Sequence, residues 1–176
     1  MGTRWIGCFA WLVFSMQAGL SIDVPEVGLL PNTPDQPLDV YLQNTGEPIP
    51  VVGVGFNIQV ADGGPPLGGK TNGPAITSVD IFTGTIFAPN NNGLSGSGSI
   101  MPQLYERGTL TRSNTVNIPT GLSKVATVTI DTTGFGCGMF SLTLNTRNGR
   151  TKYVGPDGDV FPMLVDGTVT VGSVPS

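Results

Sequence analysis

Apolar and polar residues alternate along much of the chain from residue 20 onward. In residues 38–43, Leu, Val and Leu alternate with Asp, Tyr and Gln. The same two-residue period recurs in four further segments: 54–60, 125–131, 140–145 and 168–171. Because successive side chains of a β-strand point to opposite faces, each segment predicts a strand with one apolar face.

Turn-forming residues separate these segments. The 176 residues include 26 Gly and 15 Pro, which are poor helix formers. Short turns are predicted at Asn148-Gly149 and at Pro156-Asp157-Gly158, and longer loops at 62–74 and 89–99. Residues 101–107 offer the best place for one short helical turn. We therefore predict an all-β protein, a single antiparallel β-sandwich of jelly-roll type with about nine strands.

Two glycines lie inside a predicted strand instead of between strands. Gly53 and Gly55 alternate with Val54 and Phe56 in the segment 51–60. Since glycine weakens a strand, these positions predict either a bulge or a close approach of another backbone.

The first 18 residues differ from the rest. Arg4 precedes an apolar run over 5–16, and small residues follow it. This order is typical of a secretory signal peptide, and the run is too short to span a membrane, which takes about 20 apolar residues. We predict a signal peptide at 1–18 and a secreted domain at 19–176, extracellular or at the cell surface. The mature chain is predicted to have no membrane contact.

Charge and composition exclude several functions. The net charge is −4 with only eight Lys and Arg, which argues against nucleic acid binding. The chain has no His, so the commonest general base is missing. Ser123 and Lys124 are neighbours on a strand and point to opposite faces, so they form no catalytic pair. Cys137 has no base partner and is predicted to be a small buried group at a strand start. We predict that the protein is not an enzyme.

Three residues are candidates for ligand contact. Tyr41 falls on the polar side of its strand, where its ring would face solvent and offer a saccharide platform. Asp157 and Asp159 are two residues apart across Gly158, a spacing that suits Ca²⁺ in a loop, with a solvated turn as the other interpretation. Calcium is the only cofactor that the residues suggest. Paired carboxylates also cleave glycosides, but nothing in the sequence fixes the separation of about 5–10 Å that this reaction requires.

Several segments together resemble the cohesin family. The stretch 20–60 contains Val51-Val52-Gly53-Val54-Gly55-Phe56, which is similar to an Ile-x-Gly-x-x-Phe core strand of these domains. Residues 76–90, 122–145 and the closing Asp-Gly-Thr-Val-Thr-Val at 166–171 also resemble cohesin strands. The resemblance implies a β-sandwich over about 20–172, in which one sheet face receives a helical partner of the dockerin type. It identifies no contact residue.

The pattern is also similar to small secreted bacterial proteins of the PEP-CTERM group. Those proteins end in Val-Pro-Glu-Pro, an apolar helix and basic residues, whereas this sequence ends in Val174-Pro175-Ser176. We therefore expect a released chain without an anchor.

The leading functional hypothesis is a non-enzymatic binding or adhesion module. It would recognise a protein partner or extracellular matrix through a sheet face or the loops at 62–74 and 89–99. The alternative is a carbohydrate-binding module for a polysaccharide, with calcium as a stabilising ion. A glycoside hydrolase that uses carboxylates comes last.

Overall fold

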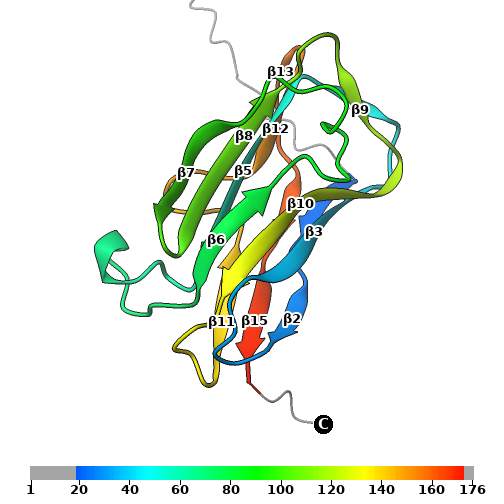
Figure 1. Cartoon of the computed structure of the whole chain (residues 1–176). Helices are drawn as coiled ribbons and strands as arrows, with labels where there is room; N and C mark the ends of the chain where they lie inside the picture. Colours follow the sequence, from blue (N-terminus) through cyan, green and yellow to red (C-terminus); the bar gives the residue numbers. More distant parts are fainter. Residues whose placement is uncertain (1–18, 173–176) are drawn as a thin grey trace, which may run out of the picture.

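The computed structural model describes residues 19–172, which form two packed β-sheets, a third sheet of two strands and no α-helix (Figure 1). The predictions about residues 1–18 and 174–176 lie outside the described residues. The described elements are one 3₁₀ turn, η1 (Pro65–Leu67), and the strands β1 (Leu20–Asp23), β2 (Glu26–Leu29), β3 (Gln36–Asn44), β4 (Ile49–Val51), β5 (Gly53–Val60), β6 (Ala75–Asp80), β7 (Ser95–Met101), β8 (Leu104–Leu110), β9 (Val116–Ile118), β10 (Gly121–Asp131), β11 (Gly138–Thr143), β12 (Lys152–Gly155), β13 (Gly158–Val160), β14 (Met163–Val165) and β15 (Gly167–Val171).

The prediction of an all-β sandwich is confirmed, but the prediction of about nine strands is wrong. The described residues contain fifteen strands. The difference arises because Gly and Pro interrupt the chain often, so that many of the strands are short. Residues 152–171, for example, form four strands of three to five residues each.

The two packed sheets differ in size, and β4 and β9 form a separate two-stranded sheet. The first has the strand order β14-β1-β3-β10-β6. The second has the order β13-β12-β5-β11-β15-β2, and β8 and β7 extend it from the other edge of β5. Figure 1 shows the layer with β3, β10 and β6 packed against the layer with β5, β8 and β12. Pairing is antiparallel except between β1 and β14 and between β2 and β15, which are parallel.

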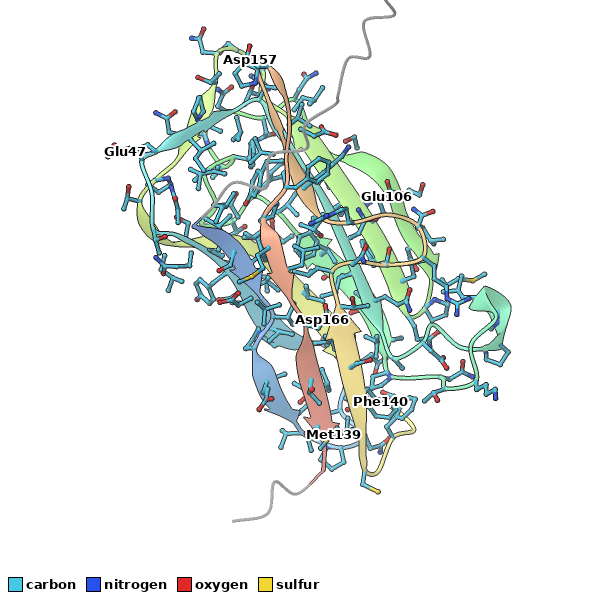
Figure 2. All side chains as sticks on the ribbon, turned by 180° about the vertical axis from the view of Figure 1, so that it is seen from behind. Glu47, Glu106, Met139, Phe140, Asp157 and Asp166 are labelled. Carbon is cyan, nitrogen blue, oxygen red and sulfur yellow. The ribbon has the colours of Figure 1, made fainter. Side chains whose placement is uncertain are left out.

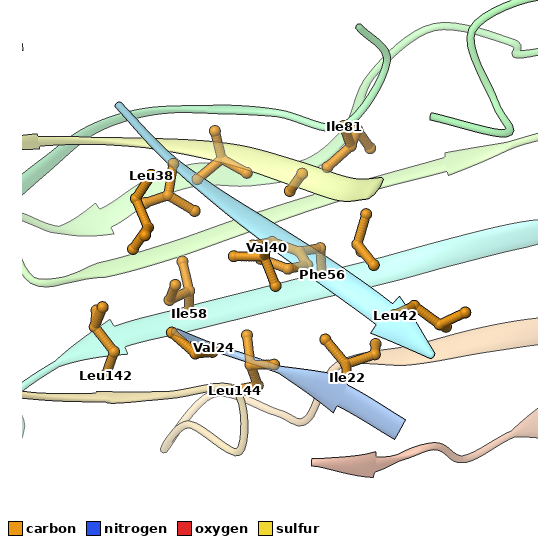
Figure 3. Close-up of a cluster of buried hydrophobic side chains, with 14 of the residues drawn as sticks. Ile22, Val24, Leu38, Val40, Leu42, Phe56, Ile58, Ile81, Leu142 and Leu144 are labelled. Atoms are coloured by element: carbon orange, nitrogen blue, oxygen red, sulfur yellow. The ribbon is translucent and has the colours of Figure 1, made fainter. Parts of the chain in front are cut away.

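The core lies between the two sheets and follows the predicted alternation. Val40 and Leu42 of β3 face Phe56 and Ile58 of β5, and all four side chains are fully buried (Figure 3). Ala126, Val128 and Ile130 of β10 and Val169 and Val171 of β15 are buried as well. The two-residue period therefore identified the inner faces of these strands correctly.

Two predictions about the middle of the chain are wrong. Residues 101–107 do not form a helical turn, and the Ser- and Gly-rich segment after residue 94 is not all loop. Both belong to the β7–β8 hairpin, in which Ser99 lies opposite Tyr105. The hairpin belongs to the larger sheet because β8 pairs along β5 from Gly53 to Gln59. This pairing places Tyr105 opposite Ile58, where its side chain is buried in the core.

Cys137 is exposed, which contradicts the prediction of a buried thiol. It lies in the loop between β10 and β11, where Phe135 packs against the core instead. The Phe135 ring meets the Phe140 ring edge to face at 5.5 Å between centroids. Because the aromatic side chain is turned inward, Cys137 lies on the solvent side of the loop.

The two strand glycines have different roles. A Cβ atom on Gly53 would lie 2.7 Å from the carbonyl oxygen of Thr109, so the predicted close backbone approach is confirmed there. A Cβ atom on Gly55 would meet no atom within 4 Å, so Gly55 borders open space. The pairing of β5 with β8 is regular, and bulges occur in β10 instead, after Lys124 and after Thr129.

Among the described residues, no helix is long and apolar enough to cross a membrane.

Candidate binding surface

One edge of β5 is shared by two strands. β11 pairs with Gln59 and Val60, and β12 pairs with the segment from Gly53 to Gly55. Between them, the side chain of Thr151 makes the two hydrogen bonds that the backbone of a paired strand would make. Its Oγ1 accepts a hydrogen bond from the Asn57 N–H and donates one to the Asn57 carbonyl oxygen, each at 2.9 Å. This exchange fixes β12 and β13 beside β5.

The loop 145–150 covers half of the outer face of β5. Asn148 Nδ2 donates to Glu106 Oε2 on β8 at 3.2 Å, and the Arg147 N–H donates to Gln59 Oε1 at 3.5 Å. Figure 2 shows Glu106 beside this loop. Asn57 and Gln59 alternate with core residues and point outward, and yet both are buried. The loop therefore closes this half of the face.

The other half of β5 is open. Gly55 points outward, because Val54 and Phe56 point into the core, and it lies between Gly108 of β8 and Lys152 of β12. No side chain rises from the two glycines, and nothing lies within 4 Å of the position of a Gly55 Cβ. The β5 backbone therefore forms a bare strip at Gly55, whereas Gly108 is buried, and a Cβ atom there would lie 2.9 Å from Ser95 Oγ of β7.

Larger side chains surround this strip. Leu110, at the end of β8, lies opposite Gly53 and is 53% exposed. On the other side, Lys152 Nζ forms an ion pair with Asp159 of β13. We call this surface the β5–β8 face and define it by Gly55, Glu106, Gly108, Leu110, Lys152 and Asp159.

Cations and an aromatic ring meet at one border of the β5–β8 face. The Arg150 guanidinium carbon lies 5.0 Å from the centre of the Phe161 ring, and Lys152 Nζ lies 5.9 Å from it. Both distances suit a cation–π interaction. Arg150 Nη2 also donates to the Pro162 carbonyl oxygen at 3.0 Å. These contacts hold two long basic side chains in defined positions.

Tyr41 lies on a different surface, the outer face of the five-stranded sheet. It is 38% exposed, as predicted, and its hydroxyl donates to Asp39 Oδ2 at 3.4 Å. Asp39 also accepts a hydrogen bond from Thr127 Oγ1 at 2.6 Å and pairs with Lys124 Nζ at 2.9 Å. These donors lower the pKa of the Asp39 carboxyl below its usual value. A saccharide platform at Tyr41 stays a prediction.

Asp157 and Asp159 lie at the turn between β12 and β13, as the sequence indicated. Asp157 lines an open cleft of about 390 Å³, and Glu47 lines the same cleft (Figure 2). Asp159 also borders it but is paired with Lys152. Within residues 19–172, no three Asp, Glu, His or Cys side chains are close enough together to hold a metal ion. Calcium binding at this turn stays a prediction.

Of the three residues proposed from the sequence, only Asp159 belongs to the β5–β8 face. Tyr41 lies on the opposite sheet. Sequence reasoning did not identify Gly108, Leu110, Glu106 or Lys152 as surface partners. The available signal was Gly55, a glycine in a strand whose neighbours on both sides are core residues.

Comparisons with known proteins bear on the fold. No family model matches the sequence, and no curated protein matches it either. Among solved structures, the chain is similar to a non-cellulosomal cohesin from the archaeon Archaeoglobus fulgidus, with 15% identity, a TM-score of 0.55, and coverage of 89% of this chain and 93% of the other.

Two further similar structures are cohesins in complex with dockerins. The OlpA cohesin complex from Clostridium thermocellum has a TM-score of 0.60 at 13% identity, covering 86% of this chain and 98% of the other. The third ScaB cohesin of R. flavefaciens, in complex with a group 1 dockerin, has a TM-score of 0.59 at 10% identity, covering 89% and 96%. The chain thus has a cohesin-like β-sandwich fold, and at this identity the likeness concerns the fold alone.

Proposed function

We propose that the protein is a non-enzymatic recognition module that binds a helical partner of the dockerin type on the β5–β8 face. The support comes from the cohesin-like fold, since several similar cohesins were solved with a dockerin bound. The observation that carries the choice of face is the open strip at Gly55.

The physical argument is that a partner can approach the backbone of the sheet closely. A partner side chain that lies on the sheet can approach the β5 backbone at Gly55, because no side chain covers the strand there. Leu110 offers an apolar anchor at one end of the strip, while Lys152 and Asp159 form a polar border. An apolar contact within a polar rim is the usual build of a protein interface. Such recognition involves no chemical step.

The experiment measures binding of the purified protein to a panel of dockerin modules, from its own organism and from the species above, by titration calorimetry. We expect at least one dockerin to bind with a Kd of about 10⁻⁶ M or tighter. Gly55→Arg fills the strip and is expected to weaken binding at least about tenfold. Gly136→Arg is the matched control, because Gly136 is also an open glycine but lies in the loop before β11.

Two results would contradict the proposal. One is the absence of binding to every dockerin in the panel. The other is equal binding by wild-type protein and Gly55→Arg, with both variants folded by circular dichroism, which would move the interface away from this face.

We also infer that the chain is exported and that residues 1–18 are removed. The support is the order of Arg4, the apolar run 5–16 and the small residues after it. N-terminal sequencing of the protein recovered from the medium or cell surface of its host tests this. A protein that retains Met1, or that stays inside the cell, would refute it.

A further inference from the structure

The loop 145–150 between β11 and β12 is a tight turn with fixed ends. The Leu144 carbonyl oxygen accepts a hydrogen bond from the Thr151 N–H at 2.9 Å, and both residues are fully buried. Within the loop, the Thr146 N–H donates to the Gly149 carbonyl oxygen at 2.9 Å, and Thr146 Oγ1 accepts from the Gly149 N–H at 3.2 Å. The loop is therefore a compact unit that is attached at two neighbouring points.

The contacts between this loop and β5 are polar and long. The loop has the sequence Asn-Thr-Arg-Asn-Gly-Arg and contains no apolar side chain. The Arg147 N–H donates to Gln59 Oε1 at 3.5 Å, and the Arg150 carbonyl oxygen accepts from Asn57 Nδ2 at 3.4 Å. Both distances exceed the usual range of about 2.7–3.2 Å, so these hydrogen bonds are weak. The loop is therefore held on β5 without apolar burial and without a strong hydrogen bond.

Two further contacts hold the tip of the loop. Asn148 Nδ2 donates to Glu106 Oε2 at 3.2 Å, and the Arg147 guanidinium donates to the Leu67 carbonyl oxygen of the neighbouring loop. Arg147 and Asn148 are both exposed, so water competes for these contacts. The tip is thus fixed only by side chains that solvent can reach.

The closed loop leaves a buried acceptor unsatisfied. Asn57 is 7% exposed, and its Oδ1 has no hydrogen-bond partner among the described residues. The backbone of Gly149 lies over this amide, since a Cβ atom on Gly149 would be 3.8 Å from Nδ2 and 3.9 Å from Oδ1 of Asn57. A buried polar atom without a partner costs free energy. Closure of the loop therefore carries a cost at Asn57 that opening removes.

Opening of the loop would extend the β5–β8 face along β5. Asn57 and Gln59 follow Gly55 at every second position of the strand, so all three point to the outer face. Glu106 of β8 lies opposite Asn57. With the loop open, two amides and a carboxylate continue the bare strip at Gly55. A partner side chain that lies on Gly55 would then reach Asn57 Oδ1 with an N–H or O–H group.

We propose that loop 145–150 is a lid that opens while the domain stays folded, and that the binding surface continues beneath it to Asn57 and Gln59. The two buried ends of the loop stay in place, and the turn between them moves away from β5. The partner supplies a hydrogen-bond donor to Asn57 Oδ1. The opening itself is independent of the proposed function, whereas the role of the lid in binding rests on it.

The first test needs no partner and measures how fast a thiol reagent reaches position 59. Gln59→Cys, in a background with Cys8→Ser and Cys137→Ser, places a thiol beneath the lid, because Gln59 is 4% exposed. Val40→Cys in the same background is the control for global unfolding, since Val40 is fully buried in the core. A thiol reacts only when it is accessible. We expect the thiol at position 59 to react at least about tenfold faster than the thiol at position 40, because local opening costs less than global unfolding.

Two substitutions of Asn148 test whether the lid controls this access. Asn148→Asp replaces the donor to Glu106 with a second carboxylate, so it is expected to open the lid and to speed the reaction at position 59 about two- to fivefold. Asn148→Lys offers Glu106 an opposite charge and is expected to slow the reaction by about the same factor. Asn148 is exposed, so neither substitution is expected to change the rate at position 40.

The second test connects the lid to binding. In the chain that keeps Gln59, both substitutions of Asn148 are measured by calorimetry with the dockerin that binds most tightly. When the binding-competent form is a minor state, the observed Kd varies inversely with its population. Asn148→Asp is therefore expected to lower the Kd by the factor by which it speeds the thiol reaction, and Asn148→Lys is expected to raise it.

Two results overturn the lid: a thiol at position 59 that reacts no faster than the thiol at position 40, and a rate at position 59 that neither substitution of Asn148 alters. Kd values that do not follow the thiol rates overturn the role of the lid in binding and leave the proposed function in place. If no dockerin binds, the proposed function fails together with that role, and the thiol rates still decide whether the lid opens.

Discussion

Replacing Thr151 by Val tests whether one side chain bridges the gap between β11 and β12. Thr151 is fully buried, and its hydroxyl satisfies both the N–H and the carbonyl oxygen of Asn57. Val has nearly the same shape but no hydroxyl, so both backbone groups would be left buried without a partner. Each such group costs about 1–3 kcal/mol. Because Val buries no polar atom of its own, we expect a net loss of about 2–4 kcal/mol in the free energy of unfolding.

The assay is urea unfolding followed by far-UV circular dichroism, since residues 19–176 contain no Trp. Thr151→Ser keeps the hydroxyl and is expected to lose only about 1 kcal/mol for the missing methyl group. Thr168→Val on β15 is the matched control and should stay within about 0.5 kcal/mol of wild type. Amide exchange at Asn57 should accelerate in Thr151→Val alone. A Thr151→Val protein as stable as wild type would refute the bridging role. A Thr151→Val protein no less stable than Thr151→Ser would refute the part of the hydroxyl in it.

Three further outcomes are expected. Phe56→Ala should cost about 3–5 kcal/mol in urea unfolding and Leu30→Ala almost nothing, because only Phe56 is enclosed by the core; equal effects would contradict the core assignment. The hydrogen bond from Thr127 helps lower the pKa of Asp39 from 3.8, so Asp39 stabilises the fold above that pH and the contribution is lost as the pH falls through the lowered pKa. The stability gap between wild type and Asp39→Asn should therefore close in acid, and a gap independent of pH would oppose this. Calcium binding at the β12–β13 turn requires that millimolar Ca²⁺ raise the thermal midpoint of wild type but not of Asp157→Asn, and an unchanged wild-type midpoint would reject it.

The sequence predicted the layers of the sandwich well. The alternation at Leu38, Val40 and Leu42 reports which side chains face the core, because a strand exposes every second residue to one side. It does not report which strands pair, since the same period fits any neighbour. The parallel pairings of β1 with β14 and of β2 with β15 therefore had no signal in the pattern.

The prediction of the binding surface was weaker for a related reason. Gly55 stood out in the sequence, but only the tertiary pairing shows whether space at a glycine is filled by another backbone, as at Gly53, or left open. Glu106 and Lys152 are far apart in sequence and reach the same face only because β8 and β12 both flank β5. Tyr41 was placed correctly as exposed, because that follows from alternation alone.

The parallel pairing of β2 with β15 has a consequence for the order of folding. β2 has no other strand partner, so its backbone hydrogen bonds wait until residues 167–171 have been synthesised. A growing chain emerges with its N-terminal part first, and contacts between such distant segments form slowly because a long loop must close. Leu29, which is buried in the finished fold, stays uncovered during that interval. The domain is thus expected to complete its fold only after residues 167–171 have been synthesised, so the first and last strands of the larger sheet join it in the same late step.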